Sequence, residues 1–132
     1  MINPLVLTAI LAALPAAVTA GEVWQTEMGG VIHQRDIGDM AVFSIPLDEI
    51  TGLIYLPGLA DGRMVEGSLT GFWISDEVGP CPAELRSPEG LMSDSWGKVE
   101  IVFDSPANRG NWTMHLGACF DAPHLTLRGL LK

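Results

Sequence analysis

The residues best suited to catalysis do not fall into a familiar catalytic pattern. The chain lacks a GxSxG nucleophile elbow, a phosphate-binding GxxxxGKS/T loop, a GxGxxG fingerprint and an HExxH zinc motif. Neighbouring carboxylates occur as the adjacent pairs Asp48-Glu49 and Asp76-Glu77. General acid–base catalysis needs two carboxyl groups in different environments, whereas adjacent acids in polar segments are typical of a solvated surface. The sequence therefore predicts no catalytic residue.

A hydrolase remains an alternative, because a catalytic triad is assembled in space rather than in sequence. It would need a histidine beside a serine and an acid. The three histidines are His33, His115 and His124. His115 falls on the polar side of an alternating segment, which favours a solvent-exposed side chain. The hydrolase hypothesis requires a serine or carboxylate beside a histidine in a cleft.

The two cysteines, Cys81 and Cys119, predict one disulfide. A metal site is the competing interpretation, because His115 and Cys119 are four positions apart. Zinc needs three or four ligands, and no CxxC or HxxxH motif accompanies this pair. We therefore expect a disulfide, no metal site and no cofactor.

Four tryptophans are many for a chain of 132 residues. Tryptophan fills cores where its N–H finds a partner, and it also lines the cavities of small barrels that hold a ligand. Both interpretations stay open here. Trp96 stands at the end of a long proline-rich segment, so we expect it to be the most exposed of the four and a candidate binding residue.

A short motif lies at Thr51-Gly52-Leu53-Ile54-Tyr55, which contains Gly-x-x-Tyr and the only tyrosine of the chain. It resembles the Ser-Gly-x-x-Tyr loop of periplasmic lysozyme inhibitors, which are small exported barrels with a disulfide. The resemblance covers five residues, and Thr51 replaces the serine. In that family the loop enters the active-site cleft of its target. The resemblance thus implies that Thr51, Gly52 and Tyr55 form a turn that contacts a lysozyme.

The first twenty residues carry no charged side chain and contain the apolar run Leu5–Leu14. Pro15 follows, and Val18-Thr19-Ala20 places small residues where a signal peptidase cleaves. This layout predicts a cleavable signal peptide at residues 1–20 and a single periplasmic or secreted domain at residues 21–132. The run is too short to span a bilayer, which takes about 20 residues. No second long apolar segment follows, so we expect no stable membrane insertion after cleavage.

The net charge is −9, and every charged residue lies after residue 20. Nucleic acids and anionic membrane surfaces require a basic patch, so this balance argues against both as partners. It permits a cationic protein partner, whose encounter it would speed, as well as a small ligand. We expect a monomer.

Short alternating segments bounded by Gly, Pro, Asn and Asp indicate strands and turns. Lys98–Asp104 and Trp112–Leu116 are predicted to form a hairpin around the turn at residues 105–110. On Val65–Trp73, two glycines share the inner face, which suits a tightly curved sheet. The fold class predicted is all-β: a small antiparallel barrel, with a sandwich as the alternative, of about eight short strands. The other predicted strands are Glu22–Thr26, Gly30–Gln34, Met40–Ile45, Leu53–Leu56 and His124–Arg128.

Two segments are not predicted as strands. Residues 57–63 read as a turn, and residues 75–97 form a long loop with three prolines, in which Ala83–Arg86 is a candidate helical turn. Loops of this length are commonly functional. The leading hypothesis is therefore an exported, non-enzymatic binding or interaction domain, with its binding residues on the long loop and the Gly52–Tyr55 turn. A lysozyme-inhibitor-like protein and a small hydrolase are the alternatives.

Overall fold

The computed structural model describes residues 21–47, 50–59, 68–105 and 108–132. The predicted signal peptide and the Asp48-Glu49 pair lie outside these residues. In the described part, no helix is long and apolar enough to span a bilayer.

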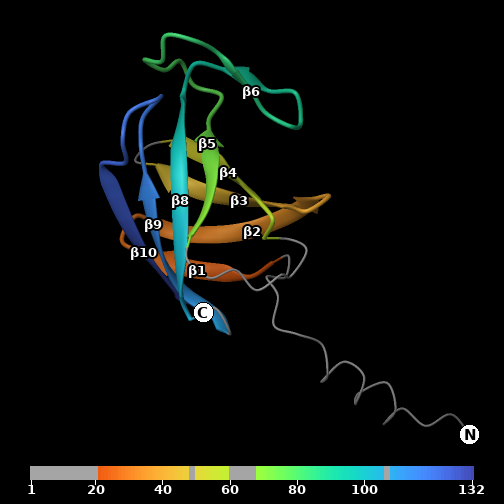
Figure 1. Cartoon of the computed structure of the whole chain (residues 1–132), viewed down its shortest axis with the longest axis vertical. Coiled ribbons are helices and arrows are strands. Elements are labelled where there is room, and N and C mark those ends of the chain that lie inside the picture. The colour runs from red at the N-terminus through yellow and green to blue at the C-terminus, as the bar shows by residue number, and fades with distance from the viewer. Residues whose placement is uncertain (1–20, 48–49, 60–67, 106–107) are drawn as a thin grey trace, which may run out of the picture.

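Eight strands form a closed antiparallel barrel in the order β1-β10-β9-β8-β5-β4-β3-β2 (Figure 1). The predicted barrel is therefore confirmed over the sandwich. The ring closes where β1 pairs with β10, with Trp24 opposite Leu131. The barrel strands are β1 Val23–Thr26, β2 Gly29–Ile37, β3 Met40–Leu47, β4 Ile50–Pro57, β5 Ser68–Ile74, β8 Trp96–Ser105, β9 Asn108–Leu116 and β10 Leu125–Leu131.

The alternating apolar residues of these strands point into the barrel and form its core. On β8 and β9 the predicted hairpin is confirmed, with Ile101 opposite Met114 and Phe103 opposite Trp112. Two tryptophans, Trp24 and Trp112, are fully buried there with ring centroids 6.1 Å apart. The buried core residues are Trp24, Val31, Ala41, Phe43, Ile45, Ile54, Leu56, Leu59, Val99, Ile101, Trp112, Met114, Leu116 and Leu127.

The barrel has two different ends (Figure 1). We call the end where β3, β5 and β9 finish and β4, β8 and β10 begin the loop end. The two longest connections at this end are the long loop (residues 75–95) and the return loop (residues 117–124). Cys81 in the first and Cys119 in the second form the predicted disulfide, with Cα atoms 5.3 Å apart.

The long loop packs on the outside of the barrel wall and creates a second core. Its buried members are Val42, Tyr55, Ile74, Cys81 and Trp96. Val42 and Tyr55 face away from the barrel interior, because their chain neighbours Ala41, Phe43 and Ile54 belong to the inner core. The long loop thus shields Val42 and Tyr55, on the outer side of the barrel wall, from solvent.

The helical turn predicted at Ala83–Arg86 is wrong. Leu85–Arg86 is strand β6 and pairs with β7, Met92–Ser93. A tight turn joins them: the Gly90 N–H bonds the Ser87 carbonyl, and Gly90 has a φ of +95°. Since the turn brings the two short segments together and Leu85 packs on the second core, pairing replaces the helical turn.

Gly71 confirms the expectation of a close approach on the inner side of β5. A Cβ atom added there would lie 1.9 Å from the Tyr55 carbonyl oxygen. Only glycine therefore lets β5 approach β4 this closely. The other glycine of that prediction, Gly67, lies outside the described residues.

Candidate functional site

The motif Thr51–Tyr55 is not a turn. All five residues lie within β4, paired with β3 from Ile50 opposite Leu47 to Pro57 opposite Met40. Tyr55 is only 1% exposed and stacks on Phe72 with ring centroids 5.2 Å apart. The expected turn is therefore wrong: the motif is a wall strand, and its tyrosine lies under the long loop.

The Tyr55 hydroxyl group instead holds the tip of the long loop. It donates to Glu89 Oε1 at 2.7 Å, and Arg35 donates to the same carboxylate through both Nε and Nη2. The hydrogen bonds from Arg35, and then from Tyr55, lower the pKa of Glu89 below its ordinary value. Burial, and then the bond to Glu89, raise the pKa of Tyr55. We call this group the latch.

The latch spans three neighbouring strands. Arg35 on β2 lies opposite Val42 on β3, which lies opposite Tyr55 on β4. Glu89 thus bridges the two strands on either side of β3, and Val42 is buried between them. The arrangement fixes the loop tip on the wall.

Trp96 is not the most exposed tryptophan, as the sequence had suggested; it is 6% exposed in the second core. Its indole N–H donates to the Ala83 carbonyl at 2.9 Å. The Phe120 ring packs edge-on against it, with centroids 4.8 Å apart. The two loops joined by the disulfide cover Trp96 between them. Trp73 is the partly exposed tryptophan.

Thr51 and Gly52 lie at separate places. Thr51 is exposed and lines a hollow of about 250 Å³ on the outer wall with Leu53, Ile74, Ser75, Asp76 and Leu91. Gly52 is buried on the inner side, where an added Cβ would lie 3.0 Å from Leu47 Cδ1. The structure therefore does not bring Thr51, Gly52, Tyr55 and Trp96 together into one site.

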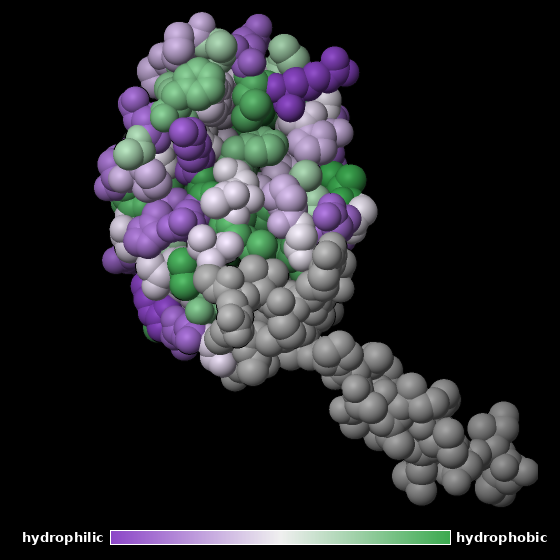
Figure 2. All heavy atoms as spheres, viewed as in Figure 1, coloured by the Kyte–Doolittle hydropathy of each residue, from purple (hydrophilic) through white to green (hydrophobic). Residues whose placement is uncertain are grey.

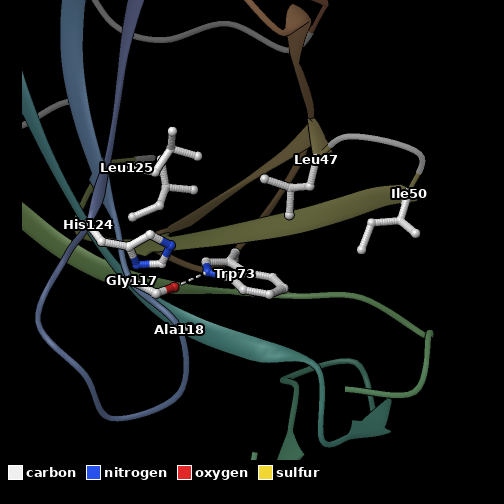
Figure 3. Close-up of a pocket in the computed structure, with 8 residues that line it drawn as sticks. Leu47, Ile50, Trp73, Gly117, Ala118, His124 and Leu125 are labelled. Atoms are coloured by element: carbon white, nitrogen blue, oxygen red, sulfur yellow. Dashed lines mark hydrogen bonds between the residues drawn. The ribbon is translucent and has the colours of Figure 1, made fainter. Parts of the chain in front are cut away.

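A pocket that sequence reasoning missed lies at the loop end of the barrel. We call it the mouth pocket; its volume is about 160 Å³. Figure 3 shows side chains from β3, β4 and β10 converging on the Trp73 ring. The lining residues are Leu47, Ile50, Trp73, Leu116, Gly117, Ala118, His124 and Leu125.

The mouth pocket offers almost no free polar group. The Trp73 indole N–H donates to the Gly117 carbonyl at 2.7 Å, so the ring presents an apolar surface (Figure 3). His124 is the one lining residue with a polar side chain. Such a pocket favours an apolar group, and the His124 imidazole is the polar side chain that could add a hydrogen bond.

Glycines create the room for this arrangement. A Cβ on Gly97, which pairs with Trp73 across β5 and β8, would lie 1.9 Å from the Gly117 carbonyl oxygen and 2.4 Å from Trp73 Nε1. The Trp73 ring can thus lie over Gly97 and bond the return loop. Gly52 leaves space beside Leu47 in the same way.

The histidines occupy three different settings. His33 is buried, with Nε2 2.6 Å from Asp36 Oδ1 and its ring edge-on to Phe43. His115 Nδ1 lies 3.1 Å from the Thr126 hydroxyl on the outer wall. His124 is exposed at the mouth pocket. The His33–Asp36 pair lines neither the mouth pocket nor the hollow at Thr51, and the hydrolase alternative stays a prediction.

One signal in the sequence could have found the mouth pocket. Trp73 and Leu116 are the last residues of the predicted strands Val65–Trp73 and Trp112–Leu116, and alternation with polar residues predicts that both side chains point inward. Inward side chains at strand ends line the mouth of a barrel. What the sequence could not show is which strand ends meet, because that depends on pairing between distant strands.

Comparison of the chain with protein-family models, with curated proteins and with solved structures gives no match. The site must therefore be interpreted from its own chemistry.

Proposed function

We propose that this protein is an exported, non-enzymatic binding domain that accepts a small apolar group in its mouth pocket. The observation that carries the proposal is the pocket itself: five apolar side chains around a tryptophan ring whose N–H is already bonded. Its place also supports a binding role, because the mouth of a small barrel is a common ligand site.

The size of the pocket narrows the class of group. Its volume of about 160 Å³ is close to that of an engineered apolar cavity of about 150 Å³ that binds benzene. A single six-membered ring or a branched alkyl group fits this space, and a larger ligand would extend out of it into solvent. The ligand, or the part of it that enters, is therefore of this size.

The experiment is a titration of the oxidised protein with benzene, followed by the indole N–H signals of its four tryptophans in an NMR spectrum. We expect the Trp73 signal to shift in a saturable manner, because this ring lines the pocket. The Trp24 signal should stay in place, since its ring is in the barrel core and its N–H bonds the Gly110 carbonyl.

A matched pair of variants tests the location. Ala118 lines the pocket, whereas Ala122 is exposed on the same loop outside the lining. Ala118→Leu should fill the pocket and abolish the benzene shift, and Ala122→Leu should leave it unchanged. Absence of a saturable Trp73 shift in the folded wild-type protein would overturn the proposal.

Export is the second part of the proposal. A disulfide between Cys81 and Cys119 is compatible with an oxidising compartment. The apolar run and Val18-Thr19-Ala20 support cleavage after Ala20. Material isolated from the native host should have the intact mass of residues 21–132. A mass that includes residues 1–20 would overturn cleavage.

A further inference from the structure

Two apolar side chains at the loop end are left in water. Phe120 is 62% exposed and Val78 is 94% exposed. Phe120 directly follows Cys119, and Val78 lies three residues before Cys81, so the disulfide ties together the two loops that carry them. Phe120 contacts Trp96 in a T-shaped arrangement, and most of its remaining surface is exposed to solvent. Exposed aromatic residues held rigidly are typical of contact surfaces.

This surface is continuous with the mouth pocket through the return loop. Gly117, Ala118 and His124 line the pocket, and Phe120 belongs to the same short segment. Figure 2 shows apolar and polar residues interspersed over the end that bears the long loop. An occupant of the pocket that extends outward would therefore meet both apolar and charged side chains.

Four exposed acidic side chains lie at this end. Glu27, in the turn between β1 and β2, Asp76 and Glu77, at the start of the long loop, and Asp121 are all exposed. None of the four forms an ion pair with another described residue.

Three of the five basic residues whose side chains are described are paired or lie at the opposite end of the barrel. Arg35 bonds Glu89 and Arg128 bonds Asp104. Lys132 follows β10 at the opposite end of the barrel. Lys98 is exposed and shares a hollow with Glu100 and with Pro123 of the return loop. Arg86 lies on β6, in the hairpin of the long loop. The four acids at this end outnumber Lys98 and Arg86, so the surroundings of the apolar mouth pocket carry an excess of negative charge.

From these observations we infer that the occupant of the mouth pocket is an apolar side chain of a partner protein, flanked there by basic residues. The inference rests on the proposed function, since it assigns the partner of the same pocket. Apolar contact with Phe120 and Val78 would add to the inserted side chain, and the acids would favour the basic flanks. Charge complementarity of this kind raises the association rate and selects the partner.

The test uses three acetylated and amidated pentapeptides as probes. The first has phenylalanine between two pairs of lysines, the second has alanine in place of phenylalanine, and the third has glutamates in place of the lysines. Each is titrated into the oxidised protein, and amide and indole signals are followed by NMR. We expect the first peptide to shift the Trp73 indole signal and the amide signals of residues 117–124.

We expect the alanine peptide and the glutamate peptide each to bind at least tenfold more weakly at low salt. The affinity of the first peptide should fall as salt rises, because the flanking charges are exposed to water. Asp121→Asn should weaken it, whereas Asp39→Asn, in the turn at the opposite end, should not. Phe120→Ala should weaken the binding of both peptides that contain phenylalanine.

The outcomes separate this inference from the proposed function. A benzene shift at Trp73 with equal affinity for the lysine and glutamate peptides overturns the basic partner and leaves the apolar pocket. A benzene shift without binding of any peptide overturns the protein partner and points to a small free ligand. Failure of benzene and of all peptides overturns both. Peptide binding that leaves the Trp73 signal unmoved overturns insertion into the pocket.

Discussion

Tyr55 carries the contact between the long loop and the barrel wall. Its ring stacks on Phe72, and its hydroxyl group donates to Glu89. Ionisation of this hydroxyl group would remove the donor and place a negative charge beside a carboxylate in a buried position. The folded protein therefore opposes ionisation, and this resistance can be measured.

We predict that Tyr55 titrates above its ordinary pKa of 10.0 in the folded protein, because burial and then the bond to Glu89 raise its pKa. As the only tyrosine of the chain, it can be followed alone by near-ultraviolet absorbance. Glu89→Gln should lower the midpoint but leave it above 10.0, since burial is the larger cause. A wild-type midpoint at or below 10.0 would contradict the latch.

The raised pKa of Tyr55 also sets the direction of a stability change. Neutral Tyr55 contributes fully to the free energy of unfolding below its pKa in the unfolded chain. This contribution is lost as the pH rises through its pKa in the folded protein. Unfolding by urea at alkaline pH should therefore need less denaturant as Tyr55 ionises. Tyr55→Phe should show a smaller alkaline loss than the wild type.

Glu89 predicts the opposite dependence at acid pH. Its pKa is lowered in the folded protein, first by the bonds from Arg35, so its contribution is complete above the ordinary value of 4.5. That contribution is lost as the pH falls through the lowered value. We expect Glu89 to contribute about 0.5 to 1 kcal/mol to the free energy of unfolding at neutral pH, because water screens these partly exposed side chains.

The measurement for Glu89 is the urea midpoint against pH for the wild type and Glu89→Gln. The variant should be less stable at neutral pH, and the difference should shrink below pH 4.5. Glu84→Gln, an exposed acid on the same loop, serves as the control and should follow the wild type. A Glu89→Gln difference that persists undiminished at low pH would exclude the charge as its origin.

Residue types alone could not show which tryptophan or tyrosine is exposed. Tyr55 bonds Glu89, 34 positions away along the chain, and Trp96 bonds Ala83, 13 positions away, so both are buried by segments that are not their chain neighbours. The tyrosine hydroxyl group and the indole N–H can form hydrogen bonds either at a binding surface or in the protein interior. The choice between these settings depends on where the long loop folds.

Among the elements, the long loop is held in place by a few specific contacts. Besides the latch, Cys81 is bonded to Cys119, and the Gly79 N–H donates to Asp94 Oδ1 at 2.8 Å. The Cys81 N–H donates to the Asp94 carbonyl at 3.0 Å. These contacts hold the base of the loop, whereas the latch holds its tip.

We predict that removal of the disulfide destabilises the protein strongly. The cysteines are 38 positions apart, and loop-closure entropy for that length gives about 4 kcal/mol. The double variant Cys81→Ser, Cys119→Ser should have a much lower melting temperature than the oxidised wild type. A reductant should lower the melting temperature of the wild type and leave the double variant unchanged. Equal melting temperatures for both proteins would contradict a stabilising bridge.

The close approach of β4 and β5 leads to a further prediction. Gly71→Ala places a methyl group against the Tyr55 carbonyl oxygen, so the two strands must move apart. We expect a loss of about 1 to 3 kcal/mol in the free energy of unfolding, as for overpacked cores. Gly30→Ala on β2 is the control, because its nearest neighbour would be Val23 Cγ1 at 3.7 Å. Equal urea midpoints for the two variants would contradict the steric argument.

The strands themselves could be predicted from the sequence. Alternation along residues 98–104 and 112–116 identified the inner sides of β8 and β9 correctly, because a barrel buries every second side chain. Strands β6 and β7 could not be found this way, since each has two residues and no alternation to detect. Their pairing depends on packing against the barrel wall.

For the whole molecule, the choice between barrel and sandwich depends on one pairing. Eight short strands fit both architectures, and only contact between β1 and β10 closes the ring. Nothing in either segment specifies its partner, because both are short alternating strands. The mouth pocket could not be predicted from the sequence for the same reason, since it forms only where the ends of β3, β5 and β9 meet the beginnings of β4 and β10.

Closure also predicts the effect of truncation. A chain that ends at Pro123 lacks β10 and would leave β1 and β9 without a partner between them. Leu127 and Gly129, against which the Trp112 ring lies, would be lost from the core. We expect this chain to lack the cooperative thermal transition and dispersed NMR spectrum of the full protein. A folded truncated protein would contradict the role of β10 in closing the ring.

The pairing of β1 with β10 has a consequence for biosynthesis. The ribosome makes β10 after the seven other barrel strands, so the ring stays open while they emerge. Such non-local pairing also folds slowly, because a long segment must be ordered before the closing contact forms. A chain that crosses a membrane must stay unfolded until it reaches the translocation channel. For the export that we propose, a strand order that postpones the final contact would give the export machinery time to engage the nascent chain.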